Sequence, residues 1–130
     1  SIAFGASENQ MLVTFSNYGV TSVWETRNGG ANWSNREGNL PDMPVRWAVY
    51  HPLNPDQVFL ATELGVWSTD DVNETNPTWN STNGGLANVR VDMLQVRTSD
   101  FVIQAATHGR GVFTALLPTS LDQTITFPAL

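Results

Sequence analysis

Three carboxylates, Asp42, Glu63 and Asp92, are the side chains of this chain best suited to acid–base chemistry. Hydrolysis of a glycosidic bond needs two carboxyl groups about 5–10 Å apart, placed across the bond that is cleaved. None of the three lies in a diagnostic catalytic motif. They are therefore candidate catalytic residues by residue type alone, and a binding role is the competing interpretation.

Arginine and histidine side chains supply the cations of the same prospective site. Arg46 and Asp92 occupy equivalent positions on two predicted strands, where they either form an ion pair or contact a ligand. His108 and Arg110 lie in the loop THGRG, where Arg110 either pairs with a carboxylate of the fold or binds a ligand. The candidate ligand contacts are Asn17, Tyr18, Arg46, Asn88, Arg90, His108 and Arg110.

Other site chemistries find little support in the sequence. Tyr18 and Trp47 either stack on sugar rings or belong to the rim and core of the fold. Asp70 and Asp71 either hold a cation or form a solvated turn. There is no cysteine, no histidine pair with metal-ligand spacing, no phosphate-binding loop and no Ser-His-Asp arrangement. We therefore expect neither a metal nor a cofactor.

The composition is that of one globular domain with an acidic surface. Hydrophobic residues make up 41% of the 130 residues, which is enough for a core. The net charge is −6, and all six basic residues are arginine. Nucleic-acid binding and polybasic membrane contact both require a basic face, so we expect neither.

The strands that must position these residues are short and recur as a unit. Runs rich in Val, Phe, Trp and Thr alternate with Gly, Pro, Asn and Asp clusters, which predicts an all-β domain. The segment from Met11 to Trp33 aligns with the one from Gln57 to Trp79, and a third copy begins at Phe101. The two tryptophans are about 46 residues apart. A period of this size with four antiparallel strands per copy is typical of a β-propeller blade.

One turn of the repeat carries a recognisable motif. The segment TRNGGANW, residues 26–33, closely resembles the Asp-box, Ser/Thr-x-Asp-x-Gly-x-Thr-Trp, of BNR-repeat β-propellers such as sialidases, sortilin-type receptors and xyloglucan-cleaving endoglucanases. Asparagine replaces the aspartate and the threonine of the motif, and a second, looser copy spans residues 68–79. The motif is structural: an Asx side chain satisfies backbone N–H groups, glycine supplies positive φ, and the tryptophan packs between sheets. The structural residues are Thr26, Asn28, Gly30, Trp33, Ser68, Asp70 and Trp79.

The repeat divides the chain into about two and three-quarter blades, covering residues 1–38, 39–84 and 85–117. The third copy lacks a tryptophan-bearing fourth strand. A closed propeller needs more blades, so we expect the partners to be missing blades or further copies of the chain. Residues 118–130 weakly resemble a linker and the start of an Ig-like module, as in large secreted or cell-surface bacterial proteins, and we expect that localisation.

Two functions follow from the resemblance. The first is a non-catalytic propeller that binds a polysaccharide or surface protein, or acts as a scaffold. The second is the C-terminal part of a secreted glycoside hydrolase. Alternating strand direction places the candidate residues on the face opposite the Asp-box turns, where propeller enzymes of this type work.

Overall fold

The protein, represented here by a computed structural model, is built from β-strands. The structure describes residues 1–82, 86, 89–118 and 127. Within these residues it contains eleven strands and no helix. It follows that the described part of the chain holds no helix long and apolar enough to cross a membrane.

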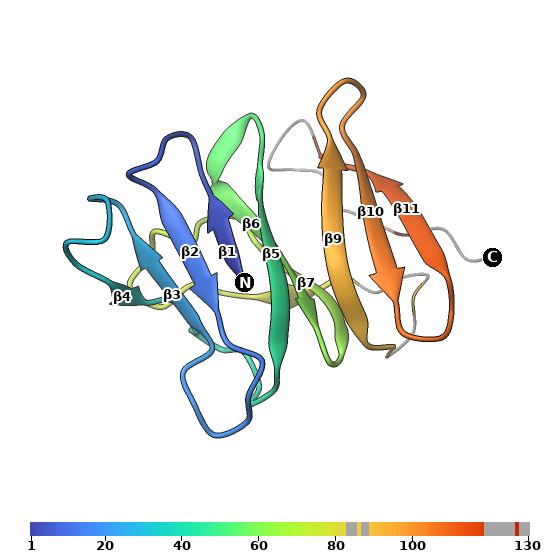
Figure 1. The fold of residues 1–130 in the computed structure, drawn as a ribbon, viewed down its shortest axis with the longest axis horizontal. Coiled ribbons are helices and arrows are strands. Elements are labelled where there is room, and N and C mark those ends of the chain that lie inside the picture. Colours follow the sequence, from blue (N-terminus) through green and yellow to red (C-terminus); the bar gives the residue numbers. More distant parts are fainter. Residues whose placement is uncertain (83–85, 87–88, 119–126, 128–130) are drawn as a thin grey trace.

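The strands form three antiparallel sheets, each a simple meander in chain order (Figure 1). The first sheet contains β1 (Ile2–Phe4), β2 (Met11–Thr14), β3 (Val23–Thr26) and β4 (Ser34–Asn35). The second contains β5 (Val45–His51), β6 (Asn54–Thr62), β7 (Gly65–Thr69) and β8 (Asn80–Ser81). The third contains β9 (Val91–Arg97), β10 (Val102–Thr107) and β11 (Val112–Leu116). The prediction of an all-β domain is confirmed.

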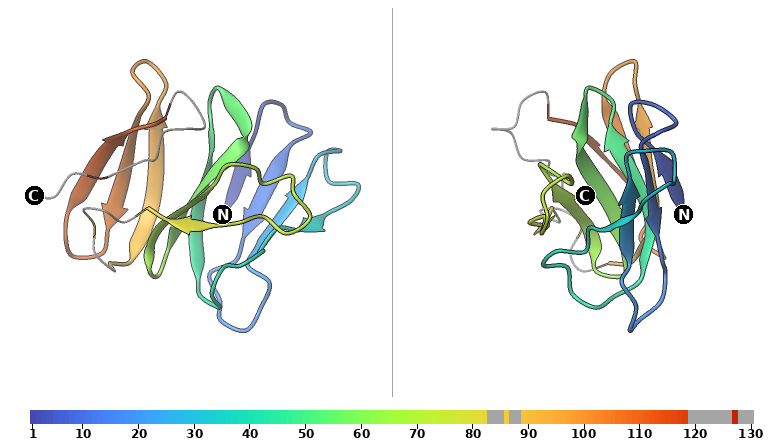
Figure 2. Two further views of the ribbon diagram at one scale, coloured as in Figure 1. Left: turned by 180° about the vertical axis from the view of Figure 1, so that it is seen from behind. Right: turned by 90° about the vertical axis from the view of Figure 1, so that its left-hand side faces the viewer.

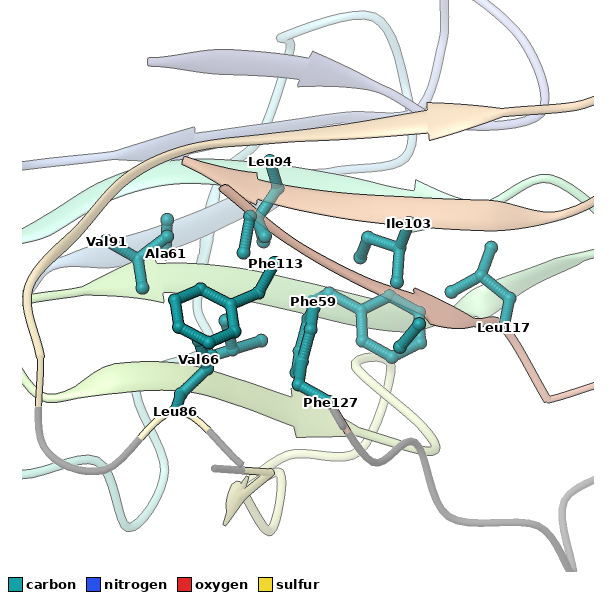
Figure 3. Close-up of a cluster of buried hydrophobic side chains, with 12 residues drawn as sticks. Phe59, Ala61, Val66, Leu86, Val91, Leu94, Ile103, Phe113, Leu117 and Phe127 are labelled. Carbon is teal, nitrogen blue, oxygen red and sulfur yellow. The ribbon is translucent and has the colours of Figure 1, made fainter. Parts of the chain in front are cut away.

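The sheets lie beside one another in chain order, with the second between the other two (Figure 1). A cluster of buried side chains fills the space between the first and second sheets, including Leu12, Val23 and Leu60. A second cluster lies between the second and third sheets, including Phe59, Leu94 and Ile103 (Figure 3). Alternation along each strand explains both clusters, because neighbouring residues point to opposite faces. The second sheet therefore has both faces covered.

The turn between β3 and β4 is held by its own side chains. Thr26 Oγ1 accepts the N–H of Gly30 at 2.9 Å, and Asn28 Oδ1 accepts the N–H of Asn32 at 2.9 Å. Gly30 has a φ of 94°, a value that a residue with a Cβ rarely adopts. These bonds close the hairpin, which supports the structural role predicted for the motif.

The two tryptophans of the repeat differ in burial. Trp79 is 1% exposed and packs in the cluster between the first two sheets. Its indole N–H donates to the Arg36 carbonyl at 2.9 Å, and its backbone exchanges two hydrogen bonds with the Asn39 side chain. Trp33, expected to pack between sheets in the same way, is 40% exposed. The reason is that no described sheet covers that face of the first sheet.

The chain between β7 and β8 reaches back across the first sheet (Figure 2). The Arg36 guanidinium donates to the carbonyl of Glu74 at 3.1 Å. The segment between β7 and β8 therefore contacts the connection from β4 to β5. It is long enough to do so because the second copy of the motif is more loosely spaced than the first.

Two described positions near the C-terminus contact the core. His51 Nδ1 accepts the Leu53 N–H at 3.0 Å, so Nε2 carries the ring proton and donates to the Pro118 carbonyl at 2.6 Å. Phe127 is fully buried in the cluster between the second and third sheets, which also contains Phe59 and Leu117 (Figure 3). The rest of the predicted Ig-like segment, residues 119–126 and 128–130, lies outside the described residues.

Candidate functional site

Most candidate residues lie at one edge of the three sheets, in loops or at the ends of strands. β5 and β9 begin at this edge, whereas β2, β6 and β10 end there, so the β2–β3, β6–β7 and β10–β11 loops gather along the lower side of Figure 1. The β3–β4 turn lies at the other edge. This is the distribution that alternating strand direction requires.

Five candidates meet in a connected group of charges. Arg46, on β5, donates from Nη2 to Oε2 of Glu63 in the β6–β7 turn at 2.6 Å. Arg90, just before β9, donates from Nε to Oδ1 of Asp92 at 2.6 Å. His108 Nδ1, from the β10–β11 loop, lies 3.5 Å from Oδ2 of Asp92. We refer to Arg46, Glu63, Arg90, Asp92 and His108 as the charged cluster.

The pairing inside the cluster is more extensive than expected. Arg46 and Asp92, for which an ion pair was one of the two predicted roles, form one, with Nε and Oδ1 4.0 Å apart. Each has a nearer partner of its own, Glu63 for Arg46 and Arg90 for Asp92. The reason is local: the turn after β6 brings Glu63 beside β5, and Arg90 is only two residues from Asp92. Arg46 therefore links two ion pairs across neighbouring sheets.

Electrostatics keeps the Asp92 carboxyl ionised. Partial burial acts to raise the pKa of Asp92, but the hydrogen bond and positive charge of Arg90 outweigh it, with a further contribution from His108. The net result is a pKa below the usual value of aspartate. A general acid for glycoside cleavage needs the opposite shift, so that it holds a proton near neutral pH. Asp92 is therefore suited to accepting hydrogen bonds or to the ionised-carboxylate role of such a mechanism, and not to the role of general acid.

The remaining candidates flank the cluster. Asp42 Oδ1 accepts the backbone N–H of Gly19 at 2.8 Å, which ties the loop bearing Asn17 and Tyr18 to the connection before β5. Asn17 and Tyr18 are exposed. Arg110 is also exposed, and no described carboxylate lies within ion-pairing distance of it, so the expected pairing is not observed. Asn88 lies outside the described residues.

Four further residues singled out in the sequence contact other parts of the fold. Trp47 is partly buried against the cluster of apolar side chains between the second and third sheets, which favours a packing role. Asp70 Oδ1 accepts a hydrogen bond from the Gln57 side chain at 3.2 Å, and Asp71 Oδ1 accepts the N–H of Asn73 at 2.9 Å. Ser68 pairs with Asn80 across β7 and β8. Among the described residues no group of three or more potential ligands is placed to hold a metal ion.

Sequence reasoning missed two features of the opposite edge. A pocket of about 600 Å³ opens there between the ends of β1, β5 and β9, lined by residues 3–6, 48–53, 55, 96 and 98. Nearby, the Glu25 carboxylate is buried between the first two sheets and paired with Arg36 and Arg27. The only sequence signal for Glu25 was its position two residues after Val23 in the same strand, which puts both side chains on one face of the sheet. That pattern does not identify the partners of the carboxylate.

No family model matches the chain, and no curated protein matches it significantly.

Proposed function

We propose that the chain is a non-catalytic binding module of the β-propeller type, in which each antiparallel sheet is one blade and the first two carry Asp-box turns. The support for the architecture is the repeated four-strand meander in chain order and the hydrogen-bonded turn at residues 26–32. The resemblance to BNR repeats supports a location on a secreted or cell-surface protein as part of this proposal. Its ligand is a polysaccharide or a surface protein.

The observation that carries the binding role is the charged cluster. Its carboxylates and guanidinium groups are held by one another, and they sit on loop and strand ends that share one edge. Preorganised donors and acceptors of this kind hydrogen-bond the hydroxyl groups of a sugar or the polar groups of a protein without carrying out chemistry. Asp92 lies 39% exposed and His108 68% exposed, so both remain accessible.

Calorimetric titration with defined sugars tests this role. The probes are a xyloglucan oligosaccharide, cellohexaose, sialyllactose and polygalacturonate. We expect one or more to bind, and Arg90→Ala to weaken that binding about 10- to 100-fold, the effect of losing hydrogen bonds to a charged group. Arg97→Ala is the matched control, because Arg97 pairs with Asp100 at the far end of β9. Equal weakening by both variants, or none by Arg90→Ala, would contradict a binding role for the cluster.

A glycoside hydrolase is the second candidate, because Glu63 and Asp92 both lie within 4.0 Å of Arg46. The two carboxylates are thereby brought to one place, as a two-carboxyl mechanism requires. Reducing-sugar release from the same polysaccharides separates the two functions. Release by the wild type that is abolished in Glu63→Gln and in Asp92→Asn would favour the hydrolase, and binding without release favours the module.

A further inference from the structure

The register of the three sheets shows which residues correspond. Ile2, Ala48 and Leu94 follow one another at about 46 residues, the spacing of the two tryptophans, and each lies in the first strand of its sheet, so they are equivalent positions on β1, β5 and β9. Ala48 faces the first sheet and Leu94 faces the second, and both are buried. Ile2, on the corresponding face of the first sheet, is 63% exposed.

On the other face of each sheet the pattern of burial is reversed: this face is covered on the first and second sheets and open on the third. Val23, Val66 and Val112 lie in the first two residues of the third strand of each sheet, opposite Thr14, Ala61 and Ala106 respectively. Val23 is buried against the second sheet and Val66 against the third. Val112, on the outer face of the third sheet, is 61% exposed. Each open face therefore has the chemical character of a face that is covered elsewhere in the same chain.

The open face of the first sheet is apolar over a wide area. Val13, Phe15, Trp24 and Trp33 line a shallow apolar hollow on it, and Ile2 and Phe4 extend it across β1. The outer face of the third sheet carries Met93, Val112 and Leu116 as its exposed apolar residues. An exposed apolar face of this extent marks an interaction surface.

We propose that the outer face of the first sheet packs on the outer face of the third sheet of a second copy of this chain. The contact repeats the packing that joins the first sheet to the second and the second to the third. Because it joins two different faces, it is heterologous and closes only as a ring. Two copies of residues 1–130 bring six of the described sheets together, a number within the four to eight blades usual for propellers, and this count rests on the proposed propeller architecture.

Sedimentation equilibrium of the whole chain tests the proposal with two exposed positions. We expect a mass of two chains for the wild type, and of one chain for Ile2→Glu and for Val112→Arg. An equimolar mixture of the two variants is expected to recover a mass of two chains, since one of its two interfaces is unaltered and the other joins Glu to Arg. Leu53→Glu is the control, because Leu53 is equally exposed but lies in the β5–β6 turn, outside both faces.

A wild-type mass of one chain would overturn the proposal and leave the open face to a different partner. Loss of the dimer in Ile2→Glu but not in Val112→Arg would also overturn it, because two copies would then meet through the first sheet alone. The far-ultraviolet circular dichroism of each variant shows whether it has folded. Sugar binding that depends on Arg90 in a single-chain protein would leave the proposed function standing without the dimer.

Discussion

The Tyr50 hydroxyl donates a hydrogen bond to the Glu25 carboxylate across 3.2 Å, and this bond joins the second sheet to the first. Burial raises the pKa of Tyr50 far above its usual value, and the neighbouring Glu25 charge adds to the shift. The hydroxyl therefore remains a donor at any pH at which the protein is handled. Arg36 Nε and Gln10 Nε2 each lie 3.3 Å from the same carboxylate.

Removing this carboxylate is expected to destabilise the fold strongly. Glu25→Leu would leave the largely buried Arg36 charge without its partner, and breaking a buried pair from one side costs about 3–5 kcal/mol of unfolding free energy. Tyr50→Phe removes one hydrogen bond and should cost about 1–2 kcal/mol. Urea unfolding measures both. Glu8→Leu, at an exposed position, should stay within about 0.5 kcal/mol, and an equally small effect of Glu25→Leu would show that the pairing is not important for stability.

A close backbone contact makes Gly38 intolerant of a side chain. A Cβ at this position would lie 1.9 Å from the Pro77 carbonyl oxygen, and the φ of 53° adds strain. We expect Gly38→Ala to lower the unfolding free energy by more than about 2 kcal/mol. Gly19→Ala is the matched control, because Gly19 also has positive φ but a Cβ there meets nothing within 4 Å. Equal losses in the two variants would show that the contact with Pro77 is easily relieved.

The lowered pKa of Asp92 predicts a pH dependence of stability. A carboxyl whose pKa is lower in the folded than in the unfolded state stabilises the fold above its unfolded value, about 3.9, and loses that contribution as pH falls through the folded value. Asp92→Asn should therefore lower Tm at pH 7 and have a smaller effect at pH 3. The contribution is modest because the group is partly exposed. Glu8→Gln serves as the control, and a Tm difference for Asp92→Asn that is independent of pH would contradict the assignment.

Phe127 is expected to contribute to folding as a core residue. Truncating a fully buried phenylalanine removes its burial energy and leaves a cavity, which costs about 3–5 kcal/mol. Phe127→Ala should lower the urea midpoint accordingly, whereas Tyr18→Ala, at an exposed aromatic, should leave it nearly unchanged. A negligible effect at Phe127 would mean that residues 118–130 fold separately from the third sheet, as the resemblance to an Ig-like module predicts.

The strands were predictable from the sequence because each depends on a local pattern. Short runs rich in Val, Phe, Trp and Thr, such as MLVT and VFLAT, with turn residues between them, predicted an all-β domain, and the structure forms strands over these segments. The partners of charged side chains were less accessible. Glu63 lies seventeen residues from Arg46 and meets it through the β6–β7 turn, whereas the sequence pattern pointed only to Asp92 as a partner of Arg46. Trp33 was expected to be buried because the pattern identifies a packing residue but does not show whether a neighbouring sheet is present.

The covered second sheet has a consequence for the order in which the molecule opens. Buried clusters hold it on both faces, whereas the first and third sheets are each held on one. In arrays whose units contact only their neighbours, local opening starts at the ends and reaches the middle last. Amide hydrogens of β6, buried from Gln57 to Thr62, should accordingly exchange with deuterium more slowly than those of β2 or β10. Covering the open faces of the outer sheets would slow exchange there toward the rate of the middle one.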